Sequence, residues 1–102
     1  MRLYQFLTTE KKEFVMSKQL LKSGTSVGAM VREAEYAQSK ADFISKLSIG
    51  LKEANETEYW ILLLKQSKYI DTEMAHELLS NINELKSILI ASIKTAKNSL
   101  KK

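Results

Sequence analysis

Hydrophobic and polar residues alternate along most of the chain with the period of an α-helix. After Thr72, apolar or small residues recur at alternating spacings of three and four, at Ala75, Leu78, Ile82, Leu85, Leu89, Ser92 and Ala96. This spacing places them on one helix face and is typical of the seam of a helical bundle. With Asp71 or Thr72 as the N-cap and lysines near the other end, the pattern predicts a helix over residues 72–99.

A similar pattern predicts a helix of about the same length before it. Ser39 is followed three residues later by Asp42, which is a variant of the capping box that starts helices. The inner face of this helix is expected to carry Phe43, Leu47, Leu51, Ala54, Ile61 and Leu64. The segment SKYIDTE has the only turn-like composition between the two apolar stripes, so the helix should end near Lys68.

The segment KSGTSVGAMVREAE interrupts a further apolar stripe with Gly24 and Gly28. Each glycine costs up to about 1 kcal/mol relative to alanine inside a helix. Gly24 could end one helical segment, with Thr25 or Ser26 capping the next, or the helix could be continuous and present a bare GxxxG face to a neighbouring backbone. We favour the continuous helix. The predicted helix-packing motif then comprises Ser23, Gly24, Thr25, Ser26, Val27 and Gly28.

The first residues, MRLYQFL, look like the last two turns of a helix. Three long helices and this segment cannot close a four-helix core, so we expect either that another subunit supplies the missing face or that the chain starts later than its relatives. With 102 residues and neither proline nor cysteine, one core without cross-links is expected. The sequence predicts a single all-α domain over residues 1–102, an antiparallel up-and-down four-helix bundle with a short or truncated first helix.

No segment resembles a signal peptide, and no apolar run approaches the roughly 20 residues of a membrane helix. We therefore expect a cytoplasmic protein without membrane association.

Charge is unevenly distributed around the net value of +4. Residues 1–32 carry six cations and two acids, residues 33–84 carry five cations and ten acids, and residues 85–102 carry five lysines and no acid. Basic ends around an acidic middle suit a surface that binds a polyanion, and they equally suit self-association of unlike surfaces.

The cations that could contact nucleic-acid phosphates lie on the two basic segments. These candidates are Lys18, Lys22, Arg32, Lys86, Lys94, Lys97, Lys101 and Lys102. The alternative for the last helix is a solvated face whose lysines also complement the helix dipole.

Residues with catalytic potential do not form a convincing site. Glu73 and His76 match one Glu-x-x-His element of a di-iron bundle, but this is the only histidine in the chain and such a site needs two. The glutamates of the middle segment have no partner at a matching spacing and are more simply solvated. We therefore expect no catalytic residue, no metal and no cofactor.

The aromatic residues could stack on bases beside lysines, but core or subunit-interface positions are the more common explanation. They include Tyr4, Tyr36, Tyr59, Trp60 and Tyr69.

Three segments carry a resemblance to a known family: QLLKSGTSVGAMVREAE (19–35), SKADFISKLSIGLKEANETEYWILLL (39–64) and SKYI (67–70). In order and spacing they resemble the four-helix-bundle proteins encoded in intervening sequences of 23S rRNA genes. The resemblance implies a bundle that forms a homopentamer around a central opening. It also implies similarity to the accessory variability protein of diversity-generating retroelements, which binds nucleic acid and a reverse transcriptase.

No enzymatic activity is established for that family, and several matching positions have no assigned chemistry: Glu33, Lys46, Lys52, Glu53, Glu56, Tyr59 and Trp60. Met30 departs from the family, where many members have a small polar residue, and the N-terminal segment is shorter than usual.

The leading hypothesis is a non-catalytic oligomeric module that binds RNA or DNA through basic patches. The alternative is a protein-interaction scaffold or an accessory subunit for a nucleic-acid-processing enzyme such as a reverse transcriptase. A metal-dependent oxidase is the third class.

Overall fold

The protein folds into four α-helices in a computed structural model that describes residues 2–100. The helices are α1 (Arg2–Thr9), α2 (Val15–Glu35), α3 (Lys40–Gln66) and α4 (Thr72–Leu100), and residues 2–100 contain no strand. Together they form a rod with extents of 52 × 21 × 16 Å. Lys101 and Lys102, two of the candidate phosphate contacts, lie outside the described residues.

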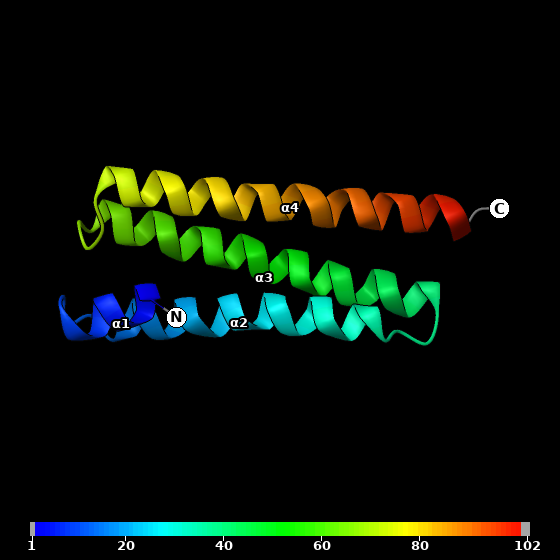
Figure 1. Cartoon of the computed structure of the whole chain (residues 1–102), viewed down its shortest axis with the longest axis horizontal. Coiled ribbons are helices and arrows are strands. Elements are labelled where there is room, and N and C mark those ends of the chain that lie inside the picture. The colour runs from blue at the N-terminus through cyan, green and yellow to red at the C-terminus, as the bar shows by residue number, and fades with distance from the viewer. Residues whose placement is uncertain (1, 101–102) are drawn as a thin grey trace.

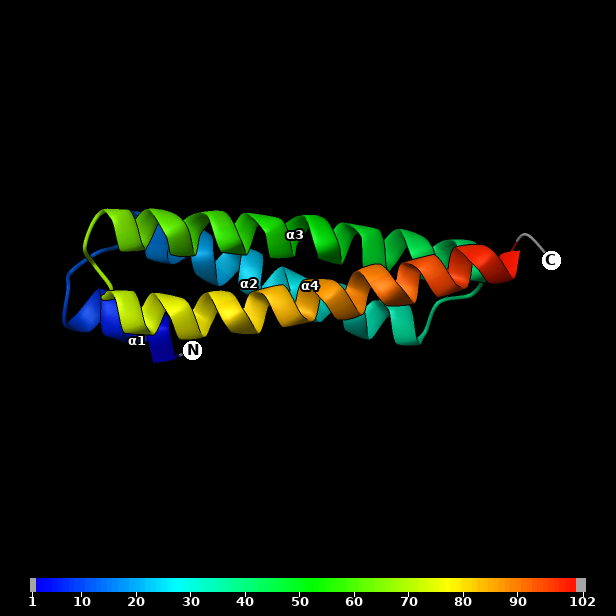
Figure 2. The same ribbon diagram turned by 90° about the horizontal axis from the view of Figure 1, so that it is seen from above.

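Successive long helices run antiparallel, so that α3 runs opposite to α2 and α4 and lies between them (Figure 1). The backbones of α2 and α4 do not approach each other, so α3 is the helix that joins them. The short α1 lies beside the first half of α2, at the end of the rod where α4 begins (Figure 2). The predicted fold, an all-α up-and-down four-helix bundle with a short first helix, is confirmed.

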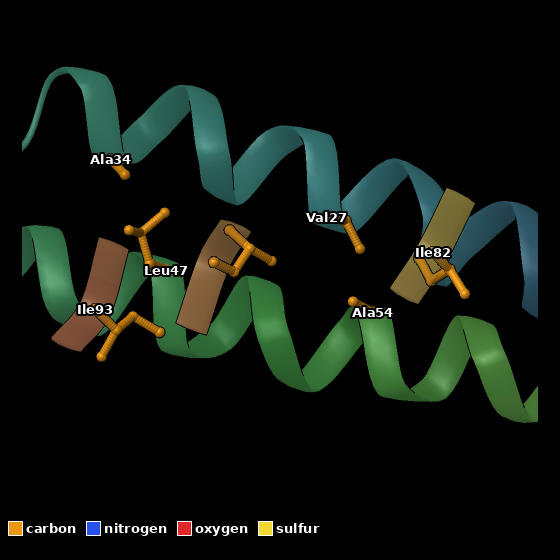
Figure 3. Close-up of a cluster of buried hydrophobic side chains, with 7 residues drawn as sticks. Val27, Ala34, Leu47, Ala54, Ile82 and Ile93 are labelled. Atoms are coloured by element: carbon orange, nitrogen blue, oxygen red, sulfur yellow. The ribbon is translucent and has the colours of Figure 1, made fainter. Parts of the chain in front are cut away.

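One hydrophobic cluster fills the half of the rod where only three helices are present. Figure 3 shows Val27 and Ala34 of α2 directed towards Ala54 and Leu47 of α3. From α4, the same cluster contains Ile82, Leu89 and Ile93. The small side chains of the two alanines let α2 and α3 lie close together, and the larger residues of α4 fill the remaining space.

A second cluster lies at the other end of the rod, and here α1 supplies the fourth wall. Leu7 of α1 is completely buried against residues of the three long helices and of the α3–α4 loop. The other buried members are Leu20, Ile61, Leu64, Ile70 and Ala75. The periodic stripes on the three long helices therefore predicted most of the buried residues, because the helix period alone sets which positions share a face.

The helix ends follow the chemistry of capping. The Ser39 hydroxyl accepts a hydrogen bond from the backbone N–H of Asp42 at 3.0 Å, as predicted for the start of α3. The Asp71 carboxylate accepts one from the N–H of Met74 at 2.7 Å and so caps α4.

The start of α2 is capped by a residue that is unusual in this role. The Glu13 carboxylate accepts hydrogen bonds from the backbone N–H groups of Val15, Met16 and Ser17, at 3.1, 3.0 and 2.7 Å. The Ser17 hydroxyl donates in return to the Glu13 carbonyl oxygen at 2.8 Å. Glu13 is only 7 % exposed, and its negative charge faces the positive end of the α2 dipole.

The region around Gly24 and Gly28 is continuous helix, as favoured from the sequence, but no other helix of this chain packs closely against the two glycines. No other part of the chain lies within 4 Å of a Cβ placed on either glycine. The physical reason is the orientation of α2. Ser23 and Met30 are among the α2 residues that contact α3, and at about 100° per residue the two glycines lie on the opposite side of the α2 core stripe from them.

The close helix contact is instead at Gly50, in the middle of α3. A Cβ on Gly50 would lie 3.4 Å from the Cβ of Met30 and 4.0 Å from the carbonyl oxygen of Val27. Nearby, the buried Thr57 hydroxyl donates a hydrogen bond to the Ser23 hydroxyl at 2.9 Å. Gly50 and this hydroxyl pair therefore set the separation of α2 and α3.

Replacing these glycines should have opposite effects on stability. Gly28→Ala should raise the free energy of unfolding by up to about 1 kcal/mol, because alanine is the better helix former and its methyl group meets nothing in the chain. Gly50→Leu should lower it by about 1–3 kcal/mol, because a large side chain would push α2 away. Urea unfolding of both variants measures the difference, and a loss of stability in Gly28→Ala would contradict the open face.

The Glu13 cap should contribute measurably to stability. Glu13→Ala should lower the free energy of unfolding by about 2 kcal/mol, because it leaves three N–H groups of α2 without their acceptor. Glu10→Ala is the matched control, since Glu10 is exposed and its loss should change stability by no more than about 0.5 kcal/mol. Equal unfolding midpoints for the two variants would show that Glu13 is not the cap.

Candidate nucleic-acid interface

The structure divides the described candidate phosphate contacts between two helices. Lys18, Lys22 and Arg32 are exposed on α2, whereas Lys86, Lys94 and Lys97 lie on α4. Since α3 separates α2 from α4 (Figure 1), one chain does not join these six residues into a single patch.

Within the α4 group, Lys86 differs from the others. Its ammonium lies 3.3 Å from the Glu58 carboxylate of α3, and both side chains are largely buried, with 19 % and 28 % exposure. Lys94 and Lys97 are exposed, and no carboxylate of residues 2–100 lies within ion-pair distance of either. Of the α4 lysines, these two are therefore available to an external anion.

A second basic region lies at the end of the rod where both the α1–α2 and α3–α4 loops turn (Figure 1). A pocket of about 490 Å³ opens between these loops. It is lined by Lys11, Lys65 and Lys68, by the rings of Phe6 and Tyr69, and by Gln66, Ile70, Asp71, Thr72 and Met74. We call it the end pocket.

The backbone of the α3–α4 loop fixes where the end-pocket residues stand. Lys68 has a φ of 64°, and the N–H groups of Lys68 and Tyr69 donate to the carbonyl oxygens of Lys65 and Leu64, each at 3.0 Å. This is the Schellman arrangement, in which a left-handed residue ends the helix and the next side chain packs back on its last turn. It directs Tyr69 onto the second hydrophobic cluster, which contains Leu64, and leaves Lys65 and Lys68 exposed.

The charge balance of the end pocket is positive. Its only acidic lining residue is Asp71, whose carboxylate already caps the Met74 N–H. The Lys11 ammonium lies 5.7 Å from the centre of the Phe6 ring, within cation–π range. The pocket therefore combines three cations with aromatic surface.

The pattern of lysines along single helices does not predict this pocket, because its residues are far apart in the chain. The antiparallel order of the helices is the feature that could have predicted it. In an up-and-down bundle, the first and third connections lie at the same end, so lysines in both connections gather there.

The hydroxyls of the glycine segment are occupied by hydrogen bonds, and the residues with catalytic potential lie exposed on the surface. The Thr25 and Ser26 hydroxyls donate to the backbone carbonyls of Leu21 and Lys22, each at 2.8 Å. Glu73 and His76 are both exposed at the start of α4. Within residues 2–100, no three His, Asp or Glu side chains are grouped as metal ligands.

The aromatic residues are divided between surface and core. Tyr36 and Tyr59 are 75 % and 56 % exposed. The Tyr59 ring meets that of Trp60 edge to face, with centroids 5.0 Å apart. Trp60 and Tyr69 pack on the second hydrophobic cluster, so their positions agree in part with the core assignment favoured from the sequence.

None of the helices described over residues 2–100 combines the length and the apolar character needed to cross a bilayer.

The comparisons with known proteins give a family and a close structural match. The family described as 23S rRNA-intervening sequence protein matches residues 1–91. A crystal structure of a protein of unknown function from the S23 ribosomal protein family of Bacteroides thetaiotaomicron is similar, with 58 % sequence identity and a TM-score of 0.90. The match covers 91 % of this chain and 83 % of the other. No curated protein matched. Because the family match extends over most of its length, the chain belongs to the 23S rRNA-intervening sequence protein family.

Proposed function

We propose that this protein is a non-catalytic, oligomeric module that binds nucleic acid, and RNA in particular, through exposed basic surface. The observation that carries the proposal is the lack of intramolecular partners for its cations. Over residues 2–100, only Lys86 forms an ion pair with a carboxylate. The exposed lysines of α2, α4 and the end pocket therefore keep their charge available for phosphates.

The family supports RNA as the polyanion to the extent that its name associates its members with intervening sequences of 23S rRNA. The structural relative, described as a protein of unknown function, adds no activity. Among the described residues, no three or more His, Asp or Glu side chains are grouped so that they could hold a metal ion. Binding is the function that the exposed charge supports best.

Self-association is supported by apolar surface that one chain leaves uncovered. A mostly apolar pocket of about 400 Å³ begins beside Arg2 and Leu3, where α1 begins, and continues along Leu78, Ile82 and Leu85 of α4. Further along α4, Ile88 and Ile90 are 56 % and 51 % exposed. We propose that copies of the chain cover such surface in a homopentamer, as the family resemblance implies.

Assembly matters to this function because the basic surfaces of one chain are small and separated. Five linked copies would present several weak phosphate sites to the same nucleic acid, and linked sites bind far more tightly than single ones. The proposal therefore joins an assembly claim to a binding claim, and the two can be tested separately.

Binding should depend on salt through the unpaired lysines. Association with a hairpin RNA should weaken with a log-log slope of roughly −0.7 to −0.9 per phosphate contact. Lys97→Gln should make this slope shallower, because it removes a cation from the basic C-terminal segment. Lys52→Gln is the charge-matched control: Lys52 is also exposed, but it lies beside Glu53 in the acidic middle segment, so its loss should leave the slope unchanged. Fluorescence anisotropy over a salt series measures both. Absence of binding by the unsubstituted protein at low salt would refute the function.

Oligomer formation can be measured without any ligand. Multi-angle light scattering should give about five times the mass of one chain, because the exposed apolar surface of α4 is covered in the assembly. Ile88→Glu should shift the distribution towards the monomer without loss of helix content, since Ile88 is more than half exposed. A monomer at all concentrations would contradict the assembly claim and leave the binding claim to the salt experiment.

A further inference from the structure

We infer that the end pocket receives an unpaired nucleotide, with the base on the Tyr69 ring and the adjoining phosphates on Lys11, Lys65 and Lys68. This inference rests on the proposed nucleic-acid binding and assigns it a place and a form of nucleic acid. The end pocket combines lysines with aromatic rings. The exposed lysines along α2 and α4 are not part of this pocket.

The end pocket is lined by three lysines. Lys11 lies in the α1–α2 loop, Lys65 in the last turn of α3 and Lys68 in the α3–α4 loop, and all three side chains are exposed. None of them lies within 4.0 Å of a carboxylate of residues 2–100. Asp71, the only acid that lines the pocket, already accepts the hydrogen bond from the Met74 N–H. The pocket therefore has a surplus of positive charge that suits phosphate groups.

The end pocket also has aromatic surface beside its lysines. Phe6 and Tyr69 line the pocket and are half-buried, with Ile70 and Met74 as apolar neighbours. Lys11 already covers the Phe6 ring at 5.7 Å, so Tyr69 is the ring we assign to the base. Proteins that bind single strands use the same pairing, in which aromatic rings stack on bases and cations follow the backbone.

The aromatic surface favours an unpaired nucleotide over the interior of a duplex. Inside a duplex, each base stacks on a neighbour on both faces, so no face is free for an aromatic side chain, and unpaired bases are the ones that proteins usually stack on. The volume of about 490 Å³ is within the usual range for small-ligand sites, roughly 300–1,000 Å³. The end pocket therefore suits one nucleotide at an end, bulge or loop and not a duplex segment.

The backbone allows the charges to be removed without disturbing the fold. Lys68 has a left-handed φ of 64°, a conformation that glycine adopts without penalty, so Lys68→Gly removes the ammonium while keeping the helix end. Lys65→Gln keeps an exposed polar side chain on α3. Tyr69→Leu removes the ring but retains an apolar contact with the Leu64 cluster, and Tyr69→Phe retains the ring itself.

The experiment compares two labelled RNAs, a single-stranded oligouridylate of about ten nucleotides and a blunt duplex of equal length, by fluorescence anisotropy at one low salt concentration. Tyr69→Leu should weaken binding of the single strand by about five-fold or more, the effect expected for losing one stacked base. It should leave the duplex affinity unchanged. Tyr69→Phe should bind the single strand as the unsubstituted protein does.

The charge variants add a readout that a purely structural role would not change. The Lys65→Gln/Lys68→Gly double variant should make the salt slope for the single strand shallower by roughly 0.7 for each lost contact. Lys52→Gln serves as the charge control. Circular dichroism must show unchanged helix content in every variant compared, and Lys68→Gly remains usable if Tyr69→Leu fails to fold.

The outcomes separate this inference from the proposed function. If the protein binds either RNA but the folded Tyr69 and Lys65/Lys68 variants bind the single strand as tightly as the unsubstituted protein, the end pocket is not the site and the proposed function stands. If the unsubstituted protein binds neither RNA, the proposed function fails and this inference fails with it. A pocket that binds inorganic phosphate but shows no effect of Tyr69→Leu would also overturn the assignment of a base.

Discussion

The separation of α2 and α3 is the constraint on which the rest of the structure depends. Gly50 has no side chain to hold α2 away, and Met30 occupies the space that this leaves. The hydrogen bond between Thr57 and Ser23 holds the same two helices together a short distance along the pair. The backbone of α4 contacts α3 and not α2. The position of α4 relative to α2 therefore depends on the contact between α2 and α3.

Much of the fold could be predicted from the sequence because the helix period is a local property. The stripe through Ala75, Ile82 and Leu89 gave the buried face of α4, and the Ser39–Asp42 pair gave the start of α3. These features depend only on residues a few positions apart. Which element packs against a helix face depends on the whole fold. The GxxxG spacing therefore identified two positions on one face but not that no other helix of the chain packs against them.

The same distinction explains the candidate site. Exposed lysines on single helices could be recognised from their positions, but the ion pair of Lys86 with Glu58 joins residues 28 positions apart. The end pocket joins loops that are further apart still. The role of Glu13 as a cap was not predicted for another reason. Glutamate is not among the usual N-cap residues, and its carboxylate reaches the N–H groups of the first turn of α2 only in the loop conformation of the folded chain.

The hydrophobic interior is divided into two clusters along the rod, and of the residues packed against them only Leu79 is shared by both. Interiors divided in this way can open in parts, since each cooperative unit has its own free energy of opening. The cluster enclosed by three helices has fewer packing contacts to stabilise it than the cluster that α1 also covers. Amide protons near the C-terminal end of α4 should consequently exchange with solvent sooner than those beside Ala75, and the protein can expose one interior while keeping the other closed.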